Sequence, residues 1–335
     1  MTARRLTRPT WLDRVSDFST QAGRGWRTVA AKELADHVLS RRFLVLLAIL
    51  GLAALATVYF SSQLIRDAAT QASGSPALFL RLFTVTGDQF PFPFFGLVSF
   101  VLPLVGIAFG FDAINGERSL GTLPRLLAQP IHRDDVINGK FAAGLLVIGL
   151  ILASVTALVA AFGLLRLGIT PGAGDVARMI AWVVLSIVYV GLWLAFAMLC
   201  SVAILRAATA ALVAFGVWLA LSLFFNLVAS LLAGALAPAA GTAPDALVAN
   251  ARLEQQLTEL SPITLYQEAT VALLNPSVRT VGVVLPQQAD RAIPSTLSID
   301  QSLLVVWPQA VALVALTVLC FAVAYVIFMR QEVRA

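Results

Sequence analysis

Residues 111–140 read FDAINGERSLGTLPRLLAQPIHRDDVINGK and lie between two long apolar runs, 89–111 and 141–165. Residues 112–140, called here the polar island, carry eight Asp, Glu, Lys and Arg side chains in a chain that is only 12% charged. A segment this polar is not stable in the hydrocarbon core of a bilayer, where an unpaired charge is costly. The sequence therefore predicts that the island lies in water at one face of a membrane.

The composition of the whole chain agrees with this prediction. The 335 residues are 59% hydrophobic, with a mean hydropathy of +0.88, whereas soluble domains are roughly 45–50% apolar. Six stretches lack Asp, Glu, Lys, Arg and His and are long enough to cross a bilayer, which takes about 20 helical residues. They are 43–65, 89–111, 141–165, 179–205, 207–244 and 301–329. We predict an all-α integral membrane protein with six transmembrane helices, because a barrel would show alternating ten-residue strands.

The end of each predicted helix follows from local signals. The third, fourth and sixth helices are expected at about 141–165, 179–205 and 304–329. The fifth stretch is too long for one span, and its end is rich in Gly, Ala and Pro, so that helix is expected to stop near Leu232. Gly106 and Gly110 lie four residues apart in the second helix, a spacing that permits close helix approach.

The distribution of Arg and Lys predicts the orientation. Sixteen of them fall on the side of the N-terminal arm, the island, Arg206 and the C-terminal tail, and seven fall on the other side. Positive charge is enriched in cytoplasmic loops, so both termini and the island are expected in the cytoplasm. The abundance of Arg, Ala, Leu and Val indicates a bacterial source, which places the protein in a bacterial cytoplasmic (inner) membrane.

Three regions are expected along the chain: a flexible cytoplasmic arm (1–25), a transmembrane domain (26–330) and a short cytoplasmic tail (331–335). Within residues 26–42 an apolar stripe recurs at helical spacing, formed by Trp26, Ala30, Leu34, Val38 and Leu39. Its polar residues fall largely elsewhere: Arg27, Lys32, Glu33, Asp36 and Arg41. This pattern predicts an amphipathic helix in contact with lipid at the cytoplasmic interface, with Arg41 and Arg42 at the entry to the membrane. The alternative is a plain extension of the first span.

The largest segment outside the membrane is 234–302. Leu253, Leu257 and Leu260 share a helical face, and Ser261-Pro262 is a good helix start. We predict two short amphipathic helices on the outer face, and an extended segment or short strand at 278–284. Two interpretations stay open: a structured cap with no ligand, or a surface for an extracytoplasmic partner. The partner contacts would be Leu257, Pro262 and Tyr266.

The sequence argues against chemistry inside this chain. No catalytic or metal site is expected, because there is no His-Glu-x-x-His motif or Gly-x-Ser-x-Gly elbow. Cys200 and Cys320 are expected to be packing residues in apolar runs. No Gly-x-x-x-x-Gly-Lys-Ser/Thr loop is present, so ATP would have to be hydrolysed by another subunit. Because the apolar stretches contain no ionisable residue, any driving energy must come from outside the membrane. Nothing indicates a nucleic-acid partner.

The island carries a long, position-specific pattern between the second and third helices. It runs Gly116-Glu117-Arg118-Ser119-Leu120-Gly121-Thr122-Leu123, then Leu126-Leu127, Pro130-Ile131, Arg133, Val136-Ile137 and Gly139-Lys140. This pattern resembles the signature of ABC-2-type transporter permeases, and the topology matches that family over about residues 26–330. The 234–302 segment, with its Ser261-Pro262 and Leu265-Tyr266 pairs, resembles the subgroup found with copper-enzyme maturation systems, which meets an extracytoplasmic partner.

The resemblance implies that the island contains a coupling helix, which docks in a groove of a cytoplasmic ABC ATPase subunit. The residues expected at that interface are Glu117, Arg118, Gly121, Thr122, Leu123, Leu126, Leu127, Pro130 and Arg133. Two ATPase copies would bind ATP and Mg, so this chain itself has no cofactor and is not an enzyme. Six helices are half of the family's twelve-helix transporter, which implies a two-fold dimer with a second permease copy, most simply a homodimer.

These expectations lead to two functions. The first is a permease that exports an amphiphilic or lipid-like molecule or a drug. The second is a subunit that transmits ATPase motion to an extracytoplasmic partner and moves no solute. A third function, an intramembrane enzyme, is disfavoured by the missing catalytic groups.

Overall fold

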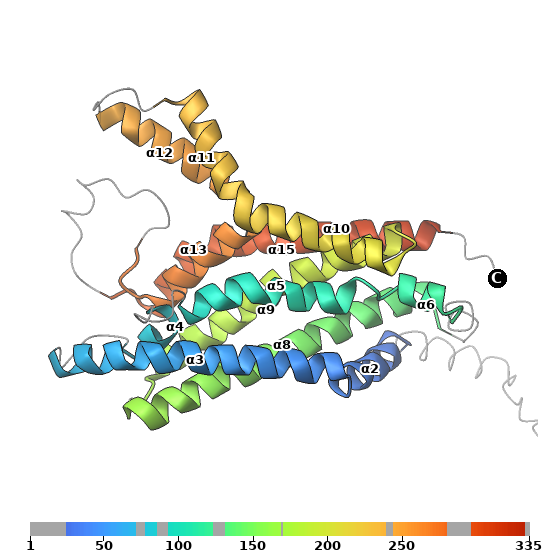
Figure 1. Ribbon diagram of the computed structural model, residues 1–335, viewed down its shortest axis with the longest axis horizontal. Helices are drawn as coiled ribbons and strands as arrows, with labels where there is room; N and C mark the ends of the chain where they lie inside the picture. Colours follow the sequence, from blue (N-terminus) through green and yellow to red (C-terminus); the bar gives the residue numbers. More distant parts are fainter. Residues whose placement is uncertain are drawn as a thin grey trace, which may run out of the picture.

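The computed structural model describes residues 25–71, 78–85, 93–122, 131–168, 170–238, 244–279 and 296–331. Six helices in these ranges are long and apolar enough to cross a membrane: Arg41–Gln63, Phe94–Ser119, Arg133–Leu167, Ala173–Ala203, Ala207–Leu236 and Ile299–Arg330. They lie side by side as one elongated bundle (Figure 1). No described residue belongs to a strand. The predicted all-α fold with six membrane-spanning helices is therefore confirmed.

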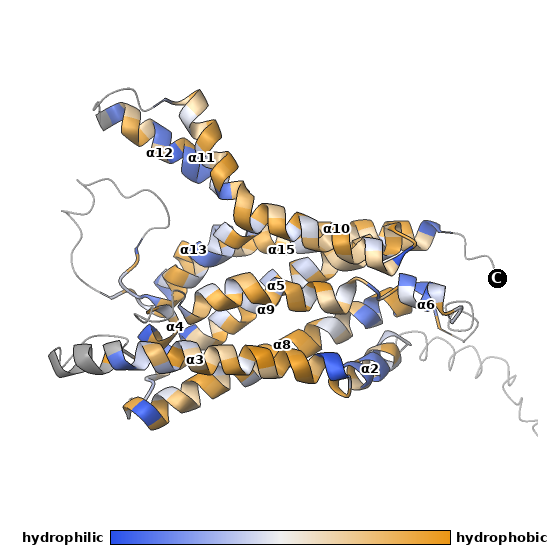
Figure 2. Ribbon diagram, viewed as in Figure 1, coloured by the Kyte–Doolittle hydropathy of each residue, from blue (hydrophilic) through white to orange (hydrophobic). Residues whose placement is uncertain are grey.

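The spanning segments are built from seven long helices and one short one. They are α3 (Arg41–Gln71), α5 (Phe94–Gly110), α6 (Asn115–Ser119), α8 (Arg133–Leu167), α9 (Ala173–Ala203), α10 (Ala207–Leu219), α11 (Phe225–Leu236) and α15 (Ile299–Arg330). The other elements are α2 (Gly25–Val38), η1 (Leu78–Leu80), α4 (Arg81–Thr84), α12 (Pro244–Thr258) and α13 (Pro262–Leu274). Hydrophobic residues dominate the middle of the bundle, and polar residues gather on α2, α6 and α12 (Figure 2). The two ends of the bundle are called the α6 end and the α12 end.

Several expected features fall on residues outside the described ranges. Only Gly25 of the predicted flexible arm and Gln331 of the predicted tail are described. Of the predicted extended segment at 278–284, only residues 278–279 are described, and neither is in a strand.

Three spanning helices begin earlier than predicted, at Arg133, Ala173 and Ile299. Their first turns are polar, and side chains satisfy the backbone groups that a helix start leaves unpaired. The Asp135 carboxylate accepts from His132 N at 3.1 Å, and the Asp175 carboxylate accepts from Gly172 N at 3.0 Å. A criterion based on charge-free stretches cannot detect helical turns that continue into water.

Helix α9 lies at the centre of the bundle and packs on α5, α8, α10, α13 and α15. Its apolar window is 67% buried, the largest share of any span. Gly106 and Gly110 of α5 face it so closely that an added Cβ would lie 2.7 Å from Val190 O and 2.7 Å from Ala197 Cβ, respectively. The pair therefore sets the distance between α5 and α9.

The fifth span changes direction near its middle. Residues Ala220–Phe224 form one π-helical stretch between α10 and α11, and α11 then diverges from the bundle together with α12 (Figure 1). Its end is at Leu236, one turn beyond the predicted stop. The Ser261 hydroxyl donates to Leu221 O within the π-helical stretch at 3.0 Å. The irregular backbone of this π-helical stretch therefore accepts a hydrogen bond from a side chain of the segment between α12 and α13.

The two helices predicted within 234–302 are present as α12 and α13, but α13 does not lie on the surface. Tyr266 is fully buried and its hydroxyl lies 2.7 Å from Ser186 Oγ of α9. One turn further along α13, Trp182 Nε1 of α9 donates to Thr270 Oγ1 at 3.2 Å. These pairs show that α13 runs antiparallel to α9 inside the bundle. The apolar face of α13 is covered by α9 and α15.

Candidate functional site

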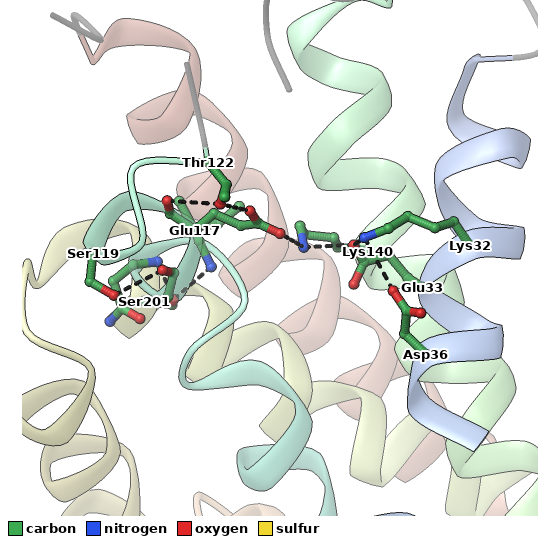
Figure 3. Close-up of polar contacts among 11 residues, drawn as sticks. Lys32, Glu33, Asp36, Glu117, Ser119, Thr122, Lys140 and Ser201 are labelled. Carbon is green, nitrogen blue, oxygen red and sulfur yellow. Dashed lines mark hydrogen bonds and ion pairs between the residues drawn. The ribbon is translucent and has the colours of Figure 1, made fainter. Parts of the chain in front are cut away.

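A buried lysine joins three helices at the α6 end. Lys140 Nζ of α8 lies 2.9 Å from Glu33 Oε1 of α2 and 3.4 Å from Glu117 Oε1 of α6 (Figure 3). The other oxygen of Glu117 accepts a hydrogen bond from the Thr122 hydroxyl. Lys140, Glu33 and Glu117 are called the lysine cluster.

Burial makes the members of this cluster depend on one another. Lys140 and Glu33 are each only 7% exposed. Removing a charge from water is costly unless an opposite charge and hydrogen bonds replace the water. The Lys140 ammonium has three donors and meets two carboxylates. Because each helix supplies one charged group, α2, α6 and α8 are held together as a unit.

The second lysine of the chain borders the same carboxylate. Lys32 Nζ lies 3.3 Å from Glu33 Oε1 and 3.1 Å from Asp36 Oδ2. Burial acts to lower the pKa of Lys32, but the charges of Glu33 and Asp36 and their hydrogen bonds raise it above its ordinary value. Its side chain is 57% exposed, so water screens these pairs and they add little stability.

One buried carboxylate serves the first turns of two helices. Asp135 Oδ1 accepts from Trp26 N of α2 at 2.9 Å, and Asp135 Oδ2 accepts from His132 N before α8 at 3.1 Å. Negative charge at a helix start is favourable because the backbone N–H groups there are unpaired. Gly139 permits this arrangement, since an added Cβ would lie 2.7 Å from Val29 Cβ. Helix α2 is therefore docked on the first two turns of α8.

Two arginines of the island, Arg118 and Arg133, contact Gln331, the residue that follows the last span. Arg118 Nη2 donates to Gln331 Oε1 at 2.5 Å, and Arg133 Nη1 donates to Gln331 O at 3.0 Å. Gln331 Nε2 in turn donates to Val202 O of α9 at 2.9 Å. The two arginines thus connect the island to the last residues of α15 and α9.

A second set of hydrogen bonds connects α6 to α9. The backbone N–H groups of Ile114 and Asn115 both donate to Ser201 Oγ, at 3.0 and 3.1 Å. Asn115 Nδ2 donates to Ile204 O at 3.3 Å. Ser201 and Asn115 are fully buried, so water does not compete for these bonds.

The structure brings together the predicted ATPase-interface residues that it describes. Glu117, Arg118 and Arg133 make the contacts given above, and Gly121 has a positive φ of 66° that ends the turn after α6. Thr122 is the last described residue before a gap. The remaining predicted residues, Leu123, Leu126, Leu127 and Pro130, lie outside the described residues.

Residues Gly25–Val38 form a helix, α2, but its buried face differs from the predicted stripe. The buried residues of α2 are Val29, Ala30 and Glu33, whereas Trp26 is 38% exposed and Leu39 is 82% exposed. Leu34 and Val38 of the stripe are half-buried against the core. Assigning Glu33 to the polar face was wrong, because Lys140 from a distant part of the chain pairs with it in the interior. Lys32 and Arg41 are exposed, and Arg42 is exposed while pairing with Asp112 at 2.8 Å.

A half-open pocket of about 220 Å³ is lined by the three residues of the lysine cluster and by other residues of α2, α3, α5 and α6. His37 lines it, with its ring edge-on to Phe109 at 4.9 Å between centroids. Burial lowers the pKa of His37, and Lys140 lowers it further, although nearby carboxylates act in the opposite direction. The histidine is therefore favoured in its neutral form.

At the α12 end, the predicted partner contacts differ in how far they are exposed. Leu257 of α12 is half-buried, but Pro262 and Tyr266 of α13 are in the interior. They are not available to a partner in this conformation. Among the described residues, no group of three or more His, Cys, Asp or Glu side chains is placed to hold a metal ion.

Sequence reasoning missed Asp135 and the paired role of Lys140. Asp135 follows the helix cap His132 by three residues, which is a known start signal, but its second bond, to α2, has no local signature. Lys140 belongs to the Gly139-Lys140 step of the island motif, yet only the fold shows which carboxylates it meets.

Comparison with known proteins is consistent with this architecture. A family model described as ABC-2 family transporter protein matches residues 27–333. A probable ABC transporter permease protein NosY of Stutzerimonas stutzeri is 30% identical over 241 residues, which cover 70% of this chain and 78% of that protein. A protein of the same description from Pseudomonas aeruginosa is 31% identical over 129 residues, covering 38% of this chain and 40% of that protein. With six membrane-spanning helices and a family match over nearly its whole length, the chain belongs to the ABC-2 transporter family, as a transmembrane subunit.

Proposed function

We propose that this subunit is the permease of a bacterial ABC exporter in the cytoplasmic (inner) membrane, with the α6 end and both termini in the cytoplasm. A separate ATPase subunit binds the polar island and supplies the energy. The substrate is an amphiphilic or lipid-like molecule or a drug, because the spans offer mostly apolar surface.

The observation that supports this proposal best is the set of bonds around the island. Glu117 reaches α2 and α8 through Lys140, and Arg118 and Arg133 reach α15 through Gln331. A displacement of the island is therefore passed to several spanning helices without a flexible connection between them. Energy transmitted through two discrete arrangements of packed elements is the usual basis of such switches.

The proposed assembly contains two copies of this chain and two ATPase subunits, which hold ATP and Mg. Two spans leave most of their apolar windows uncovered: Ala207–Leu236 is 11% buried and Ile299–Arg330 is 17% buried. Lipid and a second copy of the permease can cover these surfaces, and two-fold symmetry is the commonest arrangement for a homodimer.

The test is reconstitution of the chain with its ATPase in inside-out vesicles, followed by ATP-dependent uptake of an amphiphilic fluorescent dye. We expect uptake by the wild type. Lys140→Met is expected to retain bound ATPase but lose most of the uptake, because α6 is no longer joined by charge to α2 and α8. ATP-dependent uptake that is equal in both proteins would contradict the coupling route.

A second function is favoured by α12. This helix packs on α11 and projects from the bundle (Figure 1), and its Leu247 and Arg252 side chains are exposed. It offers a surface to an extracytoplasmic protein, which agrees with the resemblance to permeases of copper-enzyme maturation systems. In this case the subunit transmits motion and moves no solute. ATPase activity that responds to an extracytoplasmic protein and to no small molecule would support this function over export.

A further inference from the structure

An ionisable side chain lies among the spanning helices although the apolar stretches contain none. Glu268 of α13 contacts Gln309, which is the eleventh residue of α15. Ten residues of α-helix rise about 15 Å, so Gln309 lies well below the start of that span. The antiparallel pairing of Tyr266 with Ser186 places this part of α13 near the middle of α9. Glu268 therefore lies within the depth of the bundle, on the α12 side.

Gln309 has a buried acceptor with no partner. Its Nε2 donates to Glu268 Oε2 at 3.4 Å. When Glu268 is ionised, its carboxylate only accepts hydrogen bonds, so the nitrogen end of the amide faces it. Gln309 is only 8% exposed, and its Oε1 has no hydrogen-bond partner among the described residues. A buried acceptor without a hydrogen-bond donor is unfavourable. A ligand that donates a hydrogen bond would therefore satisfy Gln309 Oε1.

The surroundings of Glu268 are acidic and open on one side. Thr264, Gln267, Glu268 and Val271 form a half-exposed stripe along α13, and Glu259 acts on Glu268 as a like charge. Gln267 Nε2 donates to Ser99 Oγ of α5 at 3.1 Å, which leaves its oxygen as an acceptor on this stripe. No ion pair to Glu268 is found in the part of the chain that the structure describes.

We propose that Glu268 and Gln309 bind the protonated primary amine of an amphiphile. An ammonium group has three N–H donors and one positive charge, which match a carboxylate and a neighbouring unpaired carbonyl oxygen. The alkyl part of the ligand would lie against the apolar spans. The geometry alone supports a binding site for the amine. The further claim that this amine is the exported substrate rests on the proposed function.

The chemistry of the site argues against other ligands. An anion would be repelled by Glu268, which forms no ion pair with a basic side chain among the described residues. Bare Mg²⁺ and Ca²⁺ ions take six or more oxygen ligands, and no group of three or more His, Cys, Asp or Glu side chains that could hold a metal ion is present in the described ranges. An amphiphilic amine reaches this depth because its chain is soluble in the bilayer.

The test uses the purified full chain in phosphatidylcholine nanodiscs, without the ATPase, and measures thermal unfolding with octylammonium or octanol. Both ligands partition into lipid, so their difference isolates the ammonium group. We expect a concentration-dependent rise in unfolding temperature with octylammonium and not with octanol. Glu268→Gln should weaken the apparent affinity for octylammonium by about tenfold or more, since a charged hydrogen bond is lost. Glu254→Gln on α12 is the matched control and should bind like the wild type.

A second variant keeps the test decisive if Glu268→Gln does not fold. Gln309→Leu removes the unpaired oxygen, so the ligand-free protein should be no less stable while the octylammonium shift is lost. Equal shifts with octylammonium and octanol in the wild type would overturn the proposal. An infrared carboxylic-acid band that disappears in Glu268→Gln and is unaffected by octylammonium would also overturn it, because a proton would then fill the site. None of these outcomes depends on ATPase coupling, so the proposed function can fail separately.

Discussion

Lys140 Nζ of α8 lies 2.9 Å from Glu33 Oε1 of α2, across 107 positions of sequence. The same ammonium contacts Glu117 at the start of the island. Helix α2 is therefore held by charge as well as by packing, and the island residue that holds it also contacts α6.

Lys140→Met should strongly destabilise the docking of α2. The substitution leaves two carboxylates without their buried partner, and breaking one side of a buried ion pair costs about 3–5 kcal/mol. We expect faster hydrogen exchange in Gly25–Val38, measured by mass spectrometry in nanodiscs. Lys32→Met is the control, because its side chain is mostly exposed and its pairs are worth less than about 1 kcal/mol. Equal exchange in the two variants would show that the lysine cluster does not hold α2.

Gly139→Ala should separate α2 from α8 by steric contact alone. An added Cβ would lie 2.7 Å from Val29 Cβ and 2.8 Å from Trp26 O, so α2 must shift. We expect a loss of about 1–3 kcal/mol, typical of an overpacked contact, detected as a lower unfolding temperature. Gly174→Ala at the start of α9 meets no atom within 4 Å and should be neutral. A neutral Gly139→Ala would refute the close contact.

Arg118 and Gln331 should be energetically coupled. Their side chains share a 2.5 Å hydrogen bond, so removing either one breaks the same interaction. A double-mutant cycle of Arg118→Ala and Gln331→Ala should give an interaction energy of about 1 kcal/mol, as expected for a charge-assisted bond that is partly open to water. The measurement is unfolding of each variant in denaturant. Strictly additive effects would show that the island is not joined to α15 by this bond.

The stability of the α6 end should fall with acid through His37. Burial lowers the pKa of His37 in the folded state below the ordinary value of about 6.5, so the unfolded state binds the proton first as pH falls. Stability is then lost below about pH 6.5, down to the folded pKa. Unfolding temperatures measured from pH 7.5 to 5.5 should fall less steeply in His37→Phe than in the wild type. His132→Gln, at the exposed cap of α8, should keep the wild-type slope; a wild-type slope in His37→Phe would contradict the assignment.

The fold class was predictable because a bilayer restricts the choices. A spanning segment must satisfy its own backbone, so six long apolar stretches indicate six helices. Helix ends were less predictable, since Asp135, Asp175 and Ser298 extend helices into water beyond the apolar stretch. The position of α13 was also missed, because its apolar face fits a surface helix as well as one covered by α9.

The island motif named the family and the first contacts of the site, but its long-range partners were not in the local pattern. Glu33 and Lys140 are ordinary polar residues in their own segments, and only the fold brings them together. Glu268 was overlooked for a different reason. It lies outside every charge-free stretch, so counting those stretches could not place it among the spans.

The proposed function depends most on docking of the ATPase at the island. The most direct measurement is co-purification of the ATPase subunit with the wild type and with Leu123→Asp, which places a charge on a predicted groove contact. Leu39→Asp is the matched control, at an exposed position of the same end outside the island. We expect Leu123→Asp to lose the ATPase while Leu39→Asp and the wild type retain it, with all three proteins folded. Retention of the ATPase by folded Leu123→Asp at the wild-type level would contradict docking at the island.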